Sequence, residues 1–320
     1  MLHDIGHSPF SHALEHSIVT GISHEAVSLL FMERLNEEFN GALSMAIQIF
    51  KGTYSKHFLH QLISSQLDMD RLDYLNRDSF YTGVLEGKIG AQRIIKMLDI
   101  NDGKLVVEEK GVYSIEKFIV ARRLMYWQVY LHKTVLSAEQ LLVNILLRAK
   151  ELVNAGETLF ATPTFSYFLQ NNCSESDLRQ QPDLLNRYAQ LDDYDIFCSI
   201  KAWTEHPDPV LSRLCNGMVN RRLYKIRLRK DAYLPEEVTP YLAKAVTEFK
   251  ISDNDAKYFA FRGSISNSAY DPSGEPICIL YRDGSSTELS AASDQMEVAV
   301  LSSPIQKHFI CVLPELIDNK

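Results

Sequence analysis

The stretch that decides the fold is HDIGHSPFSHALE, residues 3–15. It belongs to an unusual concentration of histidines, because five of the ten in this 320-residue chain fall within the first 24 residues. The adjacent His3 and Asp4 offer a divalent metal ion one imidazole nitrogen and one carboxylate oxygen from a single turn of backbone. His7 follows His3 by four residues and would share a helix face with it if a helix reached this far. A histidine–aspartate pair alone occurs by chance in many proteins, so it is the whole run of residues 3–15 that indicates a metal site.

A second polar motif, QLDMDRLDYLNRDS at residues 66–79, predicts a helix. Asp70, Tyr74 and Asp78 recur every four residues and would lie on one face, with Arg71 beside them. A solvated charged face would have the same spacing. The mixture of a carboxylate, a guanidinium and a phenol suits a phosphate and a sugar better, and it favours a ligand-binding face.

A third segment, residues 114–150, predicts a long helix with a break near its middle. Arg122, Tyr126 and Tyr130 are spaced by four residues and form a polar and aromatic stripe, which Lys133 extends. A surface helix with incidental tyrosines is the alternative interpretation. The position of this stripe after the two other motifs favours a binding role.

The arrangement of helical and strand-like patterns predicts a mainly α fold with a small α/β part at the end. Up to about residue 225 the apolar spacing is helical, with Ser8-Pro9 expected to open a helix through Glu15 and Ser23 to cap the next. Residues 151–183 are expected to be an irregular surface excursion. The expected domains are a helical domain at 1–228 and an α/β domain at 229–320. The later elements are a strand at 226–228, a helix at 235–250, a hairpin of 277–281 with 286–289, and a strand at 307–313.

Composition excludes several classes of protein. Lys and Arg number 33 against 41 Asp and Glu, and the net charge of −8 argues against a general nucleic-acid binder. No apolar run approaches the roughly 18 residues that a membrane span needs, so no membrane partner is expected. The five cysteines contain no CxxC pair, which is typical of a reducing compartment and predicts a cytoplasmic location.

Taken together, these motifs resemble the signature of HD-domain metal-dependent phosphohydrolases. They are most similar to the deoxynucleoside triphosphate (dNTP) triphosphohydrolase branch, and the runs at 122–133 and 220–225 also resemble segments of that branch. The resemblance implies a helical HD domain that hydrolyses dNTPs, with dGTP among the candidates, to deoxynucleoside and triphosphate. It also implies a homo-oligomer, either a dimer or a tetramer.

The resemblance also assigns roles to individual residues. A divalent ion (Mn, Fe, Mg or Zn) would be held by His3, Asp4 and Asp70. His12, oriented by Glu15, would be the general acid, and His7 and His24 would contact phosphate oxygens. Arg71 and Arg122 would bind phosphates, Tyr74 and Asp78 would bracket the sugar, Tyr130 would lie beneath it and exclude a 2′-hydroxyl, and Tyr126 would face the base.

Two departures from the family pattern leave alternatives open. The family's fourth metal ligand is a histidine upstream of the histidine–aspartate pair, and this sequence begins two residues before His3, so we expect an N-terminally incomplete chain. The alternative is a catalytically impaired, nucleotide-binding paralogue with an open metal site. Tyr126 and Leu131 stand where the best-known eukaryotic member of the family has polar side chains, so base preference stays open. Hydrolysis of another nucleotide phosphate ester stays open too.

Overall fold

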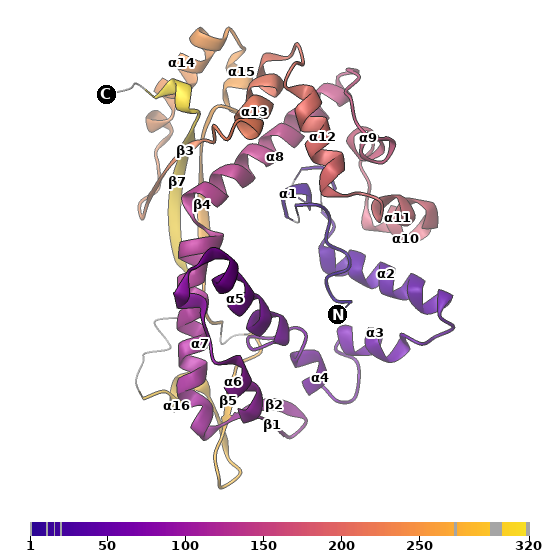
Figure 1. Ribbon diagram of the computed structural model, residues 1–320, viewed down its shortest axis with the longest axis vertical. Coiled ribbons are helices and arrows are strands. Elements are labelled where there is room, and N and C mark those ends of the chain that lie inside the picture. Colours follow the sequence, from indigo (N-terminus) through magenta and orange to yellow (C-terminus); the bar gives the residue numbers. More distant parts are fainter. Residues whose placement is uncertain are drawn as a thin grey trace. The chain divides into compact units, whose positions relative to one another are not determined.

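The computed structural model describes residues 2–10, 12–15, 17–19, 21–271, 274–294 and 303–317, without the side chains of residues 12 and 15 (Figure 1). Helices dominate, which confirms the mainly α prediction, and strands become frequent after residue 225. The chain divides into two compact units. Unit 1 contains Met1–Gly41, Lys133–Ser264 and Lys307–Lys320, and unit 2 contains Ala42–His132 and Ile265–Gln306. This division does not follow the boundary expected at residue 228, and the two sequence domains stay a prediction.

Unit 1 is built around one long amphipathic helix, α8, whose buried face includes Leu141, Ile145 and Ala149. Its neighbours α9 and α13 pack against it and contribute fully buried side chains, among them Phe165 and Leu214. The helices of unit 1 are α1 (His12–Glu15), α2 (His24–Glu38), α8 (Lys133–Asn154), α9 (Pro163–Gln170), α10 (Glu175–Gln180), α11 (Pro182–Tyr188), α12 (Asp193–Trp203), α13 (Pro209–Val219), η4 (Pro235–Glu237), α14 (Thr239–Phe249), α15 (Asp253–Ala256) and η5 (Pro314–Leu316).

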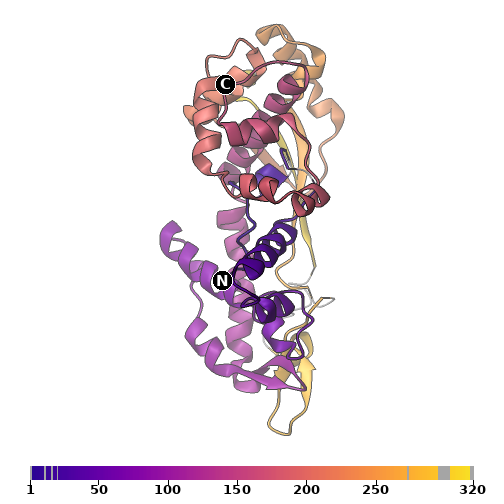
Figure 2. The same ribbon diagram turned by 90° about the vertical axis from the view of Figure 1, so that its right-hand side faces the viewer.

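A three-stranded sheet completes unit 1, in the order β3 (Lys225–Arg229), β7 (Ile305–Val312) and β4 (Ala260–Asn267). β3 pairs antiparallel with β7, so that Ile226 lies opposite Cys311. In Figure 2 the yellow strand β7 runs beside the orange strand β4. Most residues of β4 and β7 belong to unit 1, and these strands confirm the strand expectations for 226–228 and 307–313.

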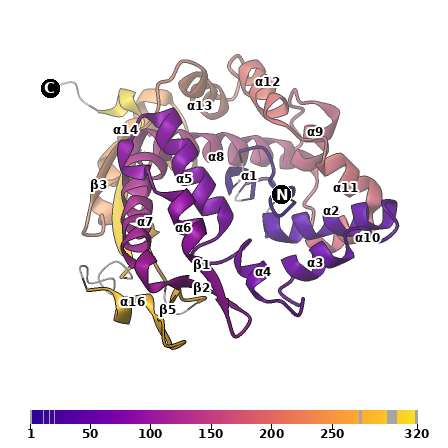
Figure 3. The same cartoon turned by 60° about the horizontal axis from the view of Figure 1, so that its bottom comes forward.

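Unit 2 buries a continuous core between α5, α6 and α7, which lie together in Figure 3. Leu75, Ile94, Ile115 and Phe118 are all fully buried there. The elements of unit 2 are α3 (Ser44–Phe50), α4 (Phe58–Gln61), α5 (Met69–Thr82), η1 (Leu85–Gly87), α6 (Ala91–Met97), β1 (Leu98–Asn101), β2 (Lys104–Glu108), η2 (Glu109–Gly111), α7 (Val112–Met125), the π-helical turn η3 (Tyr126–Tyr130), β5 (Cys278–Leu280), β6 (Ser286–Glu288) and α16 (Leu289–Ala292).

The sheet of unit 2 joins two hairpins that are far apart in the sequence. Its order is β1-β2-β5-β6, and β2 pairs parallel with β5, which places Val107 opposite Ile279. The β5–β6 hairpin confirms the sequence prediction. The β1–β2 hairpin was not predicted, although its turn residues Asp102 and Gly103 both have positive φ, of 49° and 75°. An Asp-Gly pair in that conformation is a strong hairpin signal.

Of three further local predictions, two were wrong and one is confirmed. Ser8-Pro9 does not open a helix, because Phe10 has a φ of 55° and α1 spans only His12–Glu15. The break expected within the helix at 114–150 is confirmed, because α7 ends at Met125, the π-helical turn η3 follows, and α8 begins at Lys133. The stretch expected to be an irregular surface excursion contains α9 and α10, and Phe165 and Phe168 of α9 are fully buried.

The five cysteines are all free, and Cys198 on α12 is the exposed one among them. Within the part of the chain that the structure describes, no helix combines the length and the apolar character needed to cross a membrane.

Candidate active site

The loop at residues 2–10, here called the HD loop, brings charged side chains together in unit 1. Oδ2 of Asp4 is 3.0 Å from Nε2 of His3, and Oδ1 of Asp4 is 3.6 Å from Nε2 of His7. The ring of His7 stacks on the ring of His24, with centroids 4.0 Å apart. His24 is the first residue of α2, and its place is fixed because the Ser23 hydroxyl caps this helix by accepting from the Ala26 N–H.

The donor atoms of this cluster fit a divalent metal ion. One ligand atom each from Asp4, His7 and His24 lies within 4.8 Å of the other two. Two imidazole nitrogens with a carboxylate oxygen suit zinc, iron or manganese. The prediction paired Asp4 with His3, which the structure places beside it, but it assigned His7 and His24 to phosphate contact. The structure therefore adds both histidines to the candidate metal ligands.

The proposed acid pair lies next to this cluster in the sequence. His12 and Glu15 are the first and last residues of the short helix α1. Their side chains lie outside the described part of the structure, so their roles stay predictions.

In unit 2, α5 carries the second motif, and its N-terminus is fixed by a side chain. Asp68 caps the helix by accepting from the N–H of Arg71 at 2.8 Å, and the Arg71 Nε donates to Asp68 Oδ2 at 2.9 Å. The Arg71 Nε also donates to the Ser65 carbonyl at 2.9 Å. Asp70 lies in the first turn of the helix and is half-buried. Arg71 is therefore held by its own helix terminus before any ligand binds.

The predicted sugar-binding residues form an aromatic cluster around one carboxylate. The hydroxyl of Tyr130 donates to Oδ2 of Asp78 at 2.8 Å. The Tyr130 ring makes edge contacts with Tyr74 and Tyr126, with centroids 5.8 and 5.2 Å apart. Burial raises the pKa of Tyr74 to about 12, and the neighbouring Tyr126 raises it too, whereas Arg122 acts against them. The structure thus brings four of the predicted substrate residues together.

Arg122 contacts this cluster through the ring of Tyr126, and it is almost fully buried. Its guanidinium lies 5.9 Å from the centre of the Tyr126 ring, and its Nη1 donates to Gln66 and to the Ala269 carbonyl. The residue is only 8% exposed, and its Nε has no hydrogen-bond partner among the described atoms. Arg122 thus lies beside Tyr126, and its predicted phosphate contact stays a prediction.

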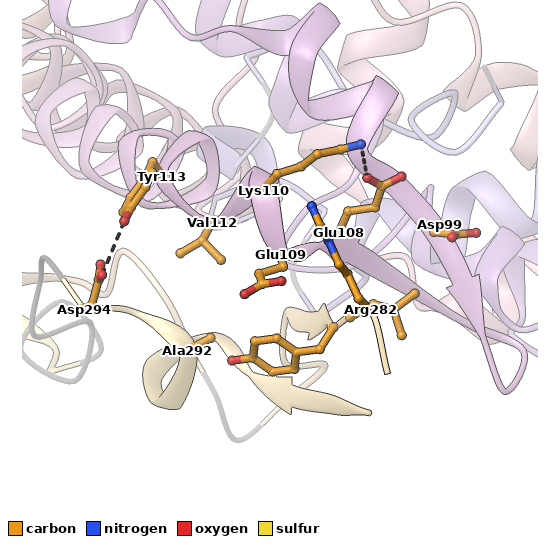
Figure 4. Close-up of a pocket in the computed structure, with 11 residues that line it drawn as sticks. Asp99, Glu108, Glu109, Lys110, Val112, Tyr113, Arg282, Ala292 and Asp294 are labelled. Carbon is orange, nitrogen blue, oxygen red and sulfur yellow. Dashed lines mark hydrogen bonds and ion pairs between the residues drawn. The ribbon is translucent and has the colours of Figure 1, made fainter. Parts of the chain in front are cut away.

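A separate cavity of about 830 Å³ in unit 2 was not predicted from the sequence (Figure 4). Its lining has more carboxylates than cations. Two interactions join lining residues: Lys110 forms an ion pair with Glu108, and the Tyr113 hydroxyl donates a hydrogen bond to Asp294. None of the predicted site residues lines it. Its charged lining residues are Asp99, Glu108, Glu109, Lys110, Arg282 and Asp294.

The predicted site residues thus fall into two groups, one in each compact unit. The HD loop with His24 belongs to unit 1, and the Asp70–Asp78 face with Arg122, Tyr126 and Tyr130 belongs to unit 2. Each group is assembled within its own unit. Their meeting in one active site, including a shared metal ion at Asp4 and Asp70, stays a prediction.

Comparison with known proteins agrees with the motifs. Residues 89–159 match the family described as the HD associated region. The uncharacterized protein YwfO of Bacillus subtilis is 33% identical over 311 residues, which cover 93% of this chain and 68% of YwfO. The crystal structure of a phosphohydrolase from Bacteroides thetaiotaomicron superposes with a TM-score of 0.92 at 51% identity, covering 97% of this chain and 77% of that one. The chain belongs to the family of HD-domain phosphohydrolases.

A more distant relative has a name that states its substrate. Human deoxynucleoside triphosphate triphosphohydrolase SAMHD1 is 20% identical over 312 residues, and the match covers 80% of this chain and 47% of the human protein. The chain therefore spans about half the length of that relative.

Proposed function

We propose that this chain is a metal-dependent phosphohydrolase that converts dNTPs, with dGTP among the candidates, to deoxynucleoside and triphosphate. The observation that carries the proposal is the cluster of Asp4, His7 and His24 in a member of this family. His3, Asp4 and Asp70 would hold the metal ion with His7 or His24 beside them. When bound, the ion would neutralise phosphate charge and activate water for attack.

The chain's own residues would carry out the proton transfers and hold the phosphates. His12, oriented by Glu15, would donate a proton to the leaving 5′ oxygen of the sugar. His7 or His24, whichever is not a metal ligand, would contact a phosphate oxygen. Arg71, already fixed by Asp68, would present its remaining N–H groups to the phosphates.

The cluster around Asp78 supports a deoxyribose rather than a ribose. Oδ2 of Asp78 is occupied by the hydroxyl of Tyr130, and its second oxygen, Oδ1, would accept from the 3′-hydroxyl. The Tyr130 ring, held by Tyr74 and Tyr126, would lie where a 2′-hydroxyl would otherwise fit. A site with no partner for a 2′-hydroxyl rejects ribonucleotides because the buried hydroxyl would lose its hydrogen bonds.

A second candidate is hydrolysis of a nucleotide ester with fewer phosphates, such as a deoxynucleoside monophosphate. Two observations favour it: Arg71 is engaged by Asp68, and Arg122 is almost fully buried. Both reduce the positive charge that the described residues offer to a triphosphate.

Product analysis tests both candidates. The full chain would be incubated with Mn²⁺ and each of the four dNTPs, the four deoxynucleoside monophosphates, or GTP, and the products separated by anion exchange. We expect triphosphate and deoxynucleoside from dNTPs and no product from GTP, with the Asp4→Asn variant inactive as control. Orthophosphate from the monophosphates alone would support the second candidate. A chain that retains metal and releases nothing from any nucleotide would contradict both.

Two further expectations belong to this proposal. The free cysteines support the cytoplasmic location inferred from the sequence. A homo-oligomer, dimer or tetramer, is expected from the family resemblance, and light scattering of the purified chain would test it.

A further inference from the structure

Both polar groups of the Gly6 backbone, in the middle of the HD loop, are held by side chains from distant helices. The Gly6 N–H donates to Oγ of Ser28 at 2.9 Å, and the Gly6 carbonyl accepts from the hydroxyl of Tyr188 at 3.2 Å. Ser28 is on α2, and Tyr188 is the last residue of α11. Ser28 is fully buried and Tyr188 is 6% exposed, so water does not compete for these bonds.

The loop also lies directly on the backbone of α2. A Cβ atom on Gly6 would come within 2.2 Å of the Ser28 nitrogen and 2.4 Å of the His24 carbonyl oxygen. No side chain fits in that space, so a glycine is required here by close approach rather than by a positive φ. The position of the Gly6 peptide is therefore fixed from three directions: by Ser28, by Tyr188 and by the helix itself.

The residues around Gly6 are those of the candidate metal cluster. Asp4 precedes Gly6 by two positions and His7 follows it directly, and the His7 N–H donates to the Asp4 carbonyl at 3.2 Å. The helix that carries Ser28 also carries His24, whose ring stacks on His7. A displacement of the Gly6 peptide would therefore move Asp4 and His7 relative to His24. Metal ligands tolerate little displacement, and the groups that orient them contribute strongly to affinity.

The ring of Tyr188 is held independently of its hydroxyl. It makes an edge contact with Phe168 at 6.0 Å between centroids and a tilted contact with Phe31 at 6.3 Å. Replacement by phenylalanine would keep these contacts and remove the oxygen atom alone. The Gly6 carbonyl would then lose the donor that Tyr188 supplies.

We propose that Tyr188 and Ser28 are positioning residues that hold the HD loop so that Asp4, together with His7 or His24, is presented to one metal ion. The inference rests on the metal site of the proposed function. It extends that site to two residues that contact neither the metal nor the substrate. It assigns Tyr188, 182 residues from Gly6 along the chain, to the active centre.

Metal binding tests this role without depending on turnover. The full chain, freed of metal with EDTA and dialysed, would be titrated with MnCl₂ by isothermal calorimetry. We expect Tyr188→Phe and Ser28→Ala each to bind Mn²⁺ roughly tenfold more weakly than the unaltered chain. Tyr233→Phe is the matched control, because Tyr233 is also buried in unit 1 and donates to a backbone carbonyl, that of Arg227, at 3.2 Å. Thermal midpoints in EDTA would be measured for all three variants.

The outcomes separate the positioning role from the alternatives. Weakened binding in Tyr188→Phe and Ser28→Ala, with Tyr233→Phe unchanged and similar thermal midpoints, supports the proposal. Unchanged affinity in both site variants overturns it, as does an equal loss in Tyr233→Phe, which would indicate general destabilisation. If the unaltered chain binds no Mn²⁺, the metal site itself is wrong, and the positioning role is wrong with it.

Discussion

Tyr130 donates its hydroxyl hydrogen to Oδ2 of Asp78 at 2.8 Å, and this bond ties the π-helical turn η3 to the last turns of α5. Within unit 2 it joins two motifs that are 52 residues apart in the sequence. It also fixes the orientation of one carboxylate oxygen before a ligand binds. The predicted sugar contact is thus preorganised, which lowers the entropy that binding must overcome.

Asp78→Asn should weaken nucleotide binding more than it slows turnover. Its amide cannot accept from both Tyr130 and a 3′-hydroxyl in the way a carboxylate can, so we expect KM for the preferred dNTP to rise about tenfold while kcat changes little. Steady-state kinetics on the purified variant measure both. Asp73→Asn on the same helix is the control, since Asp73 pairs with Arg77 on the exposed face. Equal effects of the two substitutions would contradict a sugar contact at Asp78.

Stability should fall as the pH rises from about 10 to about 12. Burial raises the pKa of Tyr74 to about 12, against roughly 10 in an unfolded chain. Between pH 10 and pH 12 the unfolded chain has lost the Tyr74 proton that the folded chain keeps, so the free energy of unfolding decreases as the pH rises. Below pH 10 both states keep this proton, and the stabilisation from Tyr74 is fully present. Urea denaturation at pH 9 and at pH 11.5 measures the difference.

Tyr74→Phe should reduce this pH dependence, because it removes one of the groups that cause it. Tyr81→Phe serves as the control, since Tyr81 is 79% exposed. If Tyr74→Phe loses as much stability between pH 9 and pH 11.5 as the unaltered chain does, Tyr74 is not a cause of the pH dependence.

Asp70→Ala should abolish bound metal if the two groups of site residues share one ion. A metal held by histidines and carboxylates loses most of its affinity when a carboxylate ligand is removed. Elemental analysis after dialysis gives the metal content per chain. Asp73→Ala, three residues further along α5, is the control. Unchanged metal in the Asp70 variant would remove Asp70 from the site and leave the ion to residues of unit 1.

Gly6→Ala should destabilise the fold by about 1–3 kcal/mol, because a new Cβ would overlap the backbone of α2. The midpoint of urea denaturation measures the loss. Gly90→Ala is the matched control, since its Cβ would meet no atom nearer than Cβ of Arg93 at 3.9 Å, and we expect a change within about 0.5 kcal/mol. A similar cost at both positions would show that the HD loop can move away from α2.

The helices were predictable from the sequence wherever a buried face repeats. Leu72 and Leu75 give α5 its core face, and Tyr74 of the predicted polar face packs partly buried against the same core. The helix start at Ser8-Pro9 was mispredicted because Phe10 takes a left-handed conformation, which its residue type does not signal. The sheet of unit 2 could not be predicted from local sequence either, because β2 pairs with the parallel strand β5, which lies some 170 residues later in the chain.

In the candidate site, too, contacts between distant segments could not be predicted from local sequence. Local spacing was enough to group Arg122, Tyr126 and Tyr130, but it did not predict that Arg122 is almost fully buried and donates to the Ala269 carbonyl. The stacking of His7 on His24 and the bond from Tyr188 to Gly6 depend on tertiary packing. Sequence periodicity carries no information about such contacts between distant segments.

The single exposed thiol gives this chain a ready attachment point for a spectroscopic label. Cys198 directly follows Phe197, whose ring makes an edge contact with Phe10 of the HD loop at 5.3 Å. Burial raises the pKa of the other four thiols, so at neutral pH a maleimide dye would react first at Cys198. Emission from that dye would follow the loop in real time while metal or nucleotide is added, with no engineered cysteine.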